Sequence, residues 1–111
     1  VAVDSSSNVY VAGTAYNGTD FGGGIVISAA NSGVSLALVR YDSAGTAQRA
    51  RTQIGVADNS EFTSVALGSG GTVYAAGILY GNSSYAFGDG VTAAGAYGGS
   101  GYNPVLVKYE E

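Results

Sequence analysis

Few side chains in this sequence are suited to acid–base or nucleophilic chemistry. The 111 residues include no histidine and no cysteine, so the commonest general base and the usual thiol nucleophile are both missing. Two carboxylates could support glycoside hydrolysis, but no two of the eight acidic residues form an evident pair. Serines are abundant, yet no G-x-S-x-G motif places one on a nucleophile turn. We therefore expect a protein that is not an enzyme and binds no cofactor.

The acidic residues fit turn chemistry better than metal binding. Calcium prefers oxygen ligands gathered in one loop, and the segments YNGTDFGGG (16–24) and FGDG (87–90) could contribute such ligands. The D-x-[DN]-x-[DN]-G spacing of a calcium loop is absent, however. Asp4 and Asp42 begin short polar segments, where an aspartate side chain bonds to its own backbone. We expect these aspartates to be turn residues, and we expect no metal site.

The nine tyrosines are the side chains best suited to recognition. Those inside apolar, strand-like segments are expected to pack in a core; they are Tyr10, Tyr41, Tyr74 and Tyr109. A tyrosine in a polar loop could either pack locally or stack on a sugar or protein partner, because its ring is large and its hydroxyl polar. The candidates for a ligand or interface role are Tyr16, Tyr80, Tyr85 and Tyr102, with Tyr97 in a similar Gly-rich loop.

Two N-x-[ST] sequons are candidate N-glycosylation sites. They begin at Asn17 (NGT) and Asn82 (NSS). A chain rich in Asn, Ser and Thr forms such sequons by chance, and their use depends on the organism. Both sequons follow matching segments of the sequence, so both are expected to lie in exposed loops.

The sequence repeats itself. Pairing Val1 with Val65 aligns VAVDSSSNVYVAG with VALGSGGTVYAAG. Two further matches follow in the same order: FGGGI (21–25) with FGDGV (87–91), and LVRY (38–41) with LVKY (106–109). Ordered matches of this kind indicate a tandem repeat with small length differences in its loops. We interpret residues 1–64 as one β repeat and residues 65–111 as a second copy that stops before its last strand.

Alternating apolar residues predict short β-strands along both copies. The expected strands are 8–13, 36–42, 46–54, 61–67 and 104–110, with weaker candidates at 25–29 and 91–95. Hairpin turns are expected at 4–8, 42–45 and 68–72. No segment sustains the 3.6-residue period of a helix, so we predict no substantial helix.

Two of these strands have informative faces. Segment 8–13 is apolar on both faces, so we expect other structure to cover both of them. Arg49 and Arg51 share a face of segment 46–54, where arginines could prevent an edge strand from pairing with other chains. Each copy thus offers four or five antiparallel strands, a unit that packs face to face with its neighbours.

The phrase VAVDSSSNVYVAG, followed by LVRYDSAGTAQ, resembles a family of bacterial β-propeller repeats known as SBBP repeats. The resemblance implies an all-β fold of tandem antiparallel four- to five-stranded blade-like repeats, in a protein that is extracellular or at the cell surface. Three positions depart from the family pattern: Ser7 replaces a glycine, Gly68 replaces the aspartate matched by Asp4, and Arg49 stands where a large aromatic is expected. These departures bear on a shared ligand site more than on the fold.

Composition excludes several partners. A net charge of −4 without a basic patch argues against nucleic acid, and no apolar run approaches the roughly 18 residues of a membrane span. The chain begins at Val1 without a signal peptide, so we interpret it as a processed product or an excised segment.

The number of repeats predicts assembly. A propeller closes with about four to eight blades, and this chain carries fewer than two copies. We therefore expect it to be completed by copies of itself or by neighbouring repeats, through strand or blade-face pairing. The expected function is that of a non-catalytic structural or assembly module in a longer chain, an oligomer or a filament. The alternative is a β-propeller module that binds carbohydrate or protein through loop tyrosines and carboxylates.

Overall fold

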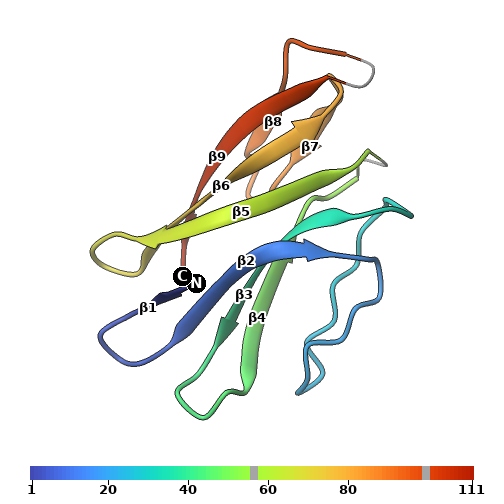
Figure 1. The fold of residues 1–111 in the computed structure, drawn as a ribbon. Coiled ribbons are helices and arrows are strands. Elements are labelled where there is room, and N and C mark those ends of the chain that lie inside the picture. Colours follow the sequence, from blue (N-terminus) through green and yellow to red (C-terminus); the bar gives the residue numbers. More distant parts are fainter. Residues whose placement is uncertain (56–57, 99–100) are drawn as a thin grey trace.

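The fold consists of β-strands joined by turns and loops (Figure 1). The computed structural model describes residues 1–55, 58–98 and 101–111. Its strands are β1 (Ala2–Val3), β2 (Val9–Ala15), β3 (Ser35–Tyr41), β4 (Ala47–Thr52), β5 (Ser60–Leu67), β6 (Thr72–Tyr80), β7 (Ser84–Ala86), β8 (Thr92–Ala94) and β9 (Tyr102–Glu110). No helix occurs in these residues, which confirms the all-β prediction.

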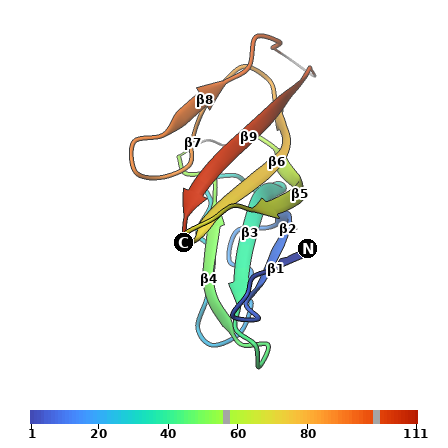
Figure 2. The ribbon, with the colours of Figure 1, turned by 90° about the vertical axis from the view of Figure 1, so that its left-hand side faces the viewer.

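The strands form antiparallel sheets, and β5, which crosses the expected boundary between the two copies at residue 64, belongs to the second large sheet. The first sheet has the order β1-β2-β3-β4, the second has the order β5-β6-β9, and β7 and β8 form a separate hairpin. β5 packs across β2 and β3, so the two larger sheets lie against each other (Figures 1 and 2). This is an open stack of two sheets; the described residues form no closed barrel or propeller.

Strand pairing has the same register in both sheets. Ala2 pairs with Tyr10 in the first sheet, and the matched residues Ala66 and Tyr74 pair in the second. The same correspondence holds along the whole of β2–β3 and β6–β9, beginning with Val9–Tyr41 and Val73–Tyr109. Segments that match in sequence therefore also match in backbone pairing.

The turns owe their shape to aspartate and to residues with positive φ. The Asp4 carboxylate accepts hydrogen bonds from the backbone N–H of Ser6 and of Asn8, both at 2.9 Å. The Asp42 carboxylate bonds the following turn in the same way, which confirms the turn role of both aspartates. Ser7 has a φ of 65°, and the matched residue Gly71 has a φ of 82°. This left-handed conformation explains why glycine suits the position of Ser7.

Two weak strand predictions need correction. Segment 25–29 is not a strand, because only Val26 pairs, in an isolated bridge with Asp20. The preceding glycines, residues 22–24, all have positive φ and turn the chain tightly, and Ile27 then packs onto the first sheet. Segment 91–95 contributes only the short strand β8, whose partner β7 was not predicted. Three-residue strands are too short to show a clear period.

The main core lies between the two large sheets. We define the Tyr10 face of the first sheet by Tyr10, Ala12, Leu36 and Leu38, and the Val73 face of the second by Val73, Ala75, Val107 and Tyr109. These two faces pack together in one apolar cluster, joined by Phe62 of β5 and by Tyr85 and Phe87 of the hairpin segment. The two faces in this contact are therefore not equivalent in the repeat, because Tyr10 of the first sheet matches Tyr74 of the second and not Val73.

A smaller cluster covers part of the opposite side of the first sheet. We define this Val9 face by Val9, Val11, Val39 and Tyr41. Ile27, from the loop that follows β2, packs there against Ala15 and Ala37. Tyr10 is buried on one side of β2, but Ala12 beside it and Val9 and Val11 on the other side stay partly exposed, so the expectation that both faces of β2 are covered holds only in part.

Candidate interaction surface

The outer side of the second sheet exposes apolar residues, next to the exposed ion pair of Lys108 and Glu110 at one end of β9. We define the Tyr74 face by Tyr74, Ala76, Pro104 and Leu106, the residues that match the four members of the Tyr10 face. The exposed fraction rises from 4% at Tyr10 to 37% at Tyr74, and from 2% at Leu38 to 68% at Leu106. Tyr10 is a core residue as predicted, whereas the same prediction for Tyr74 is wrong.

A pair of aromatic rings extends the Tyr74 face. Tyr80 and Tyr102 are register partners on β6 and β9, and their ring centroids lie 4.8 Å apart with a tilt of 54°. Tyr102 is largely exposed and Tyr80 partly so. Two of the candidate tyrosines are therefore brought together at one end of an apolar sheet face. Tyr16, by contrast, is exposed in the loop after β2, in the other sheet.

Tyr85 is a core residue rather than an exposed loop ring. Its side chain is fully buried, and its hydroxyl lies within hydrogen-bonding distance of the carbonyls of Asn59 (2.8 Å) and Tyr80 (2.7 Å). Burial raises the pKa of Tyr85 to about 12. The ring is therefore not available to a ligand at the surface, and the expectation that Tyr85 is an exposed loop tyrosine is corrected. No sequence signal identified it, because β7 is only three residues long.

The remaining candidate residues lie in exposed loops. Asn17 and Asn82 are both exposed, in the loops that follow β2 and β6. The Asn17 side-chain oxygen accepts a hydrogen bond from the Ala29 N–H at 3.0 Å, which ties the loop after β2 to itself. Tyr97 is also exposed.

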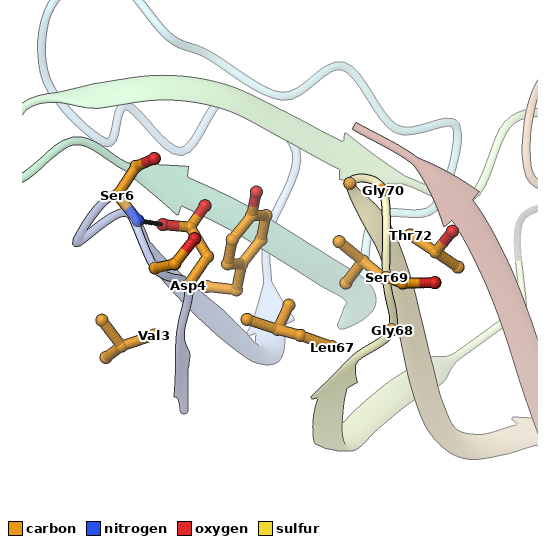
Figure 3. A pocket seen from close by; sticks show the side chains of 12 residues that line it. Val3, Asp4, Ser6, Leu67, Gly68, Ser69, Gly70 and Thr72 are labelled. Atoms are coloured by element: carbon orange, nitrogen blue, oxygen red, sulfur yellow. Dashed lines mark hydrogen bonds between the residues drawn. The ribbon is translucent and has the colours of Figure 1, made fainter.

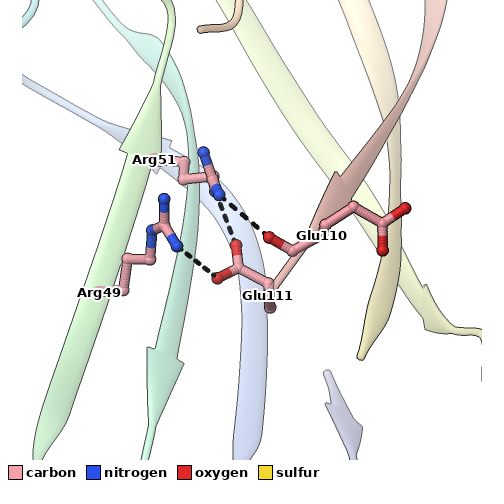
Figure 4. Close-up of polar contacts among 4 residues, drawn as sticks. All are labelled: Arg49, Arg51, Glu110 and Glu111. Carbon is pink, nitrogen blue, oxygen red and sulfur yellow. Dashed lines mark hydrogen bonds and ion pairs between the residues drawn. The ribbon is translucent and has the colours of Figure 1, made fainter. Parts of the chain in front are cut away.

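An ion pair between the sheets was not predicted (Figure 4). Arg49 and Arg51 do share a face of β4, but both point to Glu111, the residue after β9. Arg51 Nε donates to Glu111 Oε1 at 2.7 Å, and Arg49 Nη1 lies 3.5 Å from Glu111 Oε2. Arg51 also lies over the Tyr109 ring, 4.7 Å from its centroid. Arg51 thus serves the contact between sheets, in place of the edge protection suggested by the sequence.

The Tyr109 hydroxyl sits in the same region without a hydrogen-bond partner among the described residues. Burial raises the pKa of Tyr109 to about 12, although Arg51 opposes this shift. The folded state disfavours the ionised Tyr109 ring more than the unfolded state does. The contribution of the neutral ring to the free energy of unfolding is therefore complete below pH 10, and it is lost as the pH rises through about 12. A shift of this size corresponds to roughly 2–3 kcal/mol.

We expect Tyr109→Phe to remove this part of the alkaline loss of stability. At pH 7 the variant should unfold within about 1 kcal/mol of the parent, because no hydrogen bond is lost. Urea unfolding at intervals from pH 7 to pH 12 measures both effects. Tyr85→Phe is the control, since it removes a bonded hydroxyl and should lose about 1–2 kcal/mol already at pH 7. An unchanged alkaline profile in Tyr109→Phe would contradict the assignment.

A cavity of about 570 Å³ separates the matched turns 4–8 and 68–72 (Figure 3). The Asp4 carboxylate lines it, but both of its oxygens bond within the turn, one of them to the Asn8 side chain. These bonds, above all that from the Asn8 side chain, lower the pKa of Asp4. The matched position on the other wall is Gly68, which offers no second carboxylate. Among the described residues, no three metal-binding side chains cluster here or elsewhere.

Comparison with known protein families, with curated proteins and with solved structures finds no match to this chain. Nowhere in the described part of the chain does a helix reach the length and apolarity that a membrane crossing requires.

Proposed function

We propose that this protein is a non-catalytic assembly module whose β repeats stack with further copies, in a longer chain, an oligomer or a filament. The observation that carries the proposal is the contact already present within the chain, where the Tyr10 face packs on the Val73 face. The matching Tyr74 and Val9 faces lie at the two outer ends of the stack. Because the two sheets pack face to face within the chain, the matching outer faces can pack in the same way between units.

Stacking of this kind joins two different surfaces. By analogy with the internal contact, the Tyr74 face of one unit lies on the Val9 face of the next. Such a heterologous contact either closes into a ring or continues as a filament, depending on the rotation between units. The blade-like repeats of a propeller are the ring case. The resemblance of the repeat phrases supports this case, together with an extracellular or surface location.

The apolar character of the outer faces supports stacking over catalysis. Leu106 and Tyr74 stand exposed on one sheet face, and Val3 is exposed beside the Val9 face. Burying a side chain such as leucine contributes about 1.5–3 kcal/mol, so two or three of them supply a useful driving force. Large exposed apolar patches in soluble proteins commonly mark interaction sites. Neither outer face carries histidine or cysteine, since the sequence contains none.

We expect the purified chain to associate as its concentration rises, and Leu106→Lys to prevent this. Sedimentation velocity over a hundredfold concentration range measures the effect as a shift in weight-average sedimentation coefficient. A lysine at position 106 places a charge in the centre of the Tyr74 face, where stacking would remove it from water. Ala44→Lys is the matched control, because it adds the same charge in an exposed turn.

Two results would contradict the stacking proposal. One is a parent chain that stays folded and monomeric throughout the range. The other is association that Leu106→Lys leaves unchanged, which would place the contact on a different surface.

A further inference from the structure

One edge of β2 is paired along only part of its length. β1 pairs with β2 at Val9 and Tyr10 alone. In the second sheet, β5 pairs with β6 from Val73 to Leu79. The stretch Val11–Ala15 therefore has β3 along one edge, while among the described residues no strand pairs with its other edge.

Glycine is required in β6 because β5 approaches it closely. The register of β5 on β6 shifts between Phe62 and Ser64, which marks an irregularity of the β-bulge type. A Cβ added at Gly77 would lie 1.8 Å from the carbonyl oxygen of Glu61 and 2.7 Å from the Phe62 Cα. Gly77 does not have a positive φ, so close backbone approach, and not a turn, is what demands glycine here.

Gly13 is the matched residue in β2, and no contact of the described residues explains why glycine is needed there. It pairs with Ala37 as Gly77 pairs with Val105. Its φ is not positive, and a Cβ added there would meet no atom within 4 Å. Glycine in a strand interior weakens the strand and often marks a place where another backbone approaches. The close partner that Gly77 has is missing at Gly13.

We propose that the free edge of β2 at Val11–Ala15 receives a bulged strand of the β5 type. The strand enters in line with β1, runs antiparallel to β2, and places a backbone carbonyl against Gly13. The segment that occupies this edge has the chemistry of residues 60–64, which are an extended polar segment with one phenylalanine. In the second sheet, Phe62 packs edge-on against Tyr109, with ring centroids 6.4 Å apart. The matched ring, Tyr41, is partly exposed and available for the same contact.

This inference rests on the repeat interpretation that underlies the proposed function, but it concerns strand pairing and not face stacking. The register determines where the new strand must lie. Val1 matches Val65, so the five residues that precede Val65, Ser-Glu-Phe-Thr-Ser, are the matching extension for Val1. That sequence is therefore the probe.

The test fuses Ser-Glu-Phe-Thr-Ser directly ahead of Val1 in the full chain. We expect the melting temperature to rise by roughly 5 °C, because a strand is added to an open edge. Amide hydrogen exchange within Val11–Ala15 should slow at the same time. A fusion of the same length with alanine in place of phenylalanine should recover only part of the gain, since it lacks the ring contact with Tyr41.

Gly13→Ala distinguishes specific pairing from a general effect of the added residues. In the parent chain it should leave the melting temperature nearly unchanged, because the site is open. In the extended chain it should remove most of the gain, because its Cβ meets the new backbone. Gly77→Ala is the matched control and should lower the melting temperature of both chains.

An extension that changes neither melting nor exchange would overturn the proposal. So would an extended chain whose gain survives Gly13→Ala. Either failure leaves the stacking proposal intact, because that proposal is tested by the association of the unextended chain.

Discussion

Leu38→Ala should lower the free energy of unfolding by about 3 kcal/mol, the typical cost of leaving a cavity in a packed core. Leu38 is buried between the two sheets, among Tyr10 and the residues of the Val73 face. Leu106 occupies the matching position on β9 but is largely exposed. Leu106→Ala should therefore change the free energy of the monomer by no more than about 0.5 kcal/mol.

The two leucine variants form a matched pair, because they remove the same atoms from equivalent strand positions. Urea unfolding at low protein concentration measures both, so that association does not add to the stability of the parent. The difference between them reports which face of each sheet is covered. Equal losses would contradict the observed stacking, in which the two sheets use different faces.

Arg51→Ala should lower the free energy of unfolding by about 3 kcal/mol. The side chains of Arg51 and Glu111 are only 13% and 3% exposed, so the substitution leaves a buried carboxylate without its closest partner. Arg49→Ala should cost less than about 1 kcal/mol, because Arg49 is half exposed and its nitrogen lies farther from the carboxylate. Chemical unfolding of both variants at pH 7 tests the ranking.

A double-mutant cycle separates the ion pair from the packing of the arginine stem. Glu111→Gln removes the charge and keeps the size of the side chain. If the charges interact as the 2.7 Å contact indicates, the Arg51→Ala/Glu111→Gln double variant should lose less than the sum of the single losses. Additive losses would mean that Arg51 stabilises the fold only through its contact with Tyr109 and its neighbours.

The Arg51–Glu111 pair is particular to the contact within the chain. With the offset of 68 that relates Leu38 to Leu106, the residue that matches Glu111 is Ser43, which carries no charge. A unit stacked on the Val9 face would therefore find no carboxylate at this position. Stacking between units would lack this ion pair, and the charged groups that the Tyr74 face brings to the contact are those of the exposed Lys108–Glu110 pair.

Much of the local structure follows from the sequence. Alternating apolar residues located β2, β3, β4, β5 and β9 to within a few residues, because side chains of a strand point to opposite faces in turn. Aspartate and glycine marked the hairpin turns, because they bond their own backbone or tolerate positive φ. The internal match of the sequence anticipated the equal pairing registers of the two sheets. The apolar segment around Tyr10 correctly predicted its burial, but the same reasoning was wrong for Tyr74.

The candidate surface depended on tertiary structure. Periodicity shows that Tyr10 and Tyr74 occupy equivalent strand faces, but it cannot show that a neighbouring sheet covers only the first. The burial of Tyr85 depends on a strand too short to have a period, and Arg51 meets a carboxylate 60 residues away. Local sequence determines which way a side chain points, because backbone geometry alternates regularly. Which of those directions lead to solvent is decided only when distant segments pack.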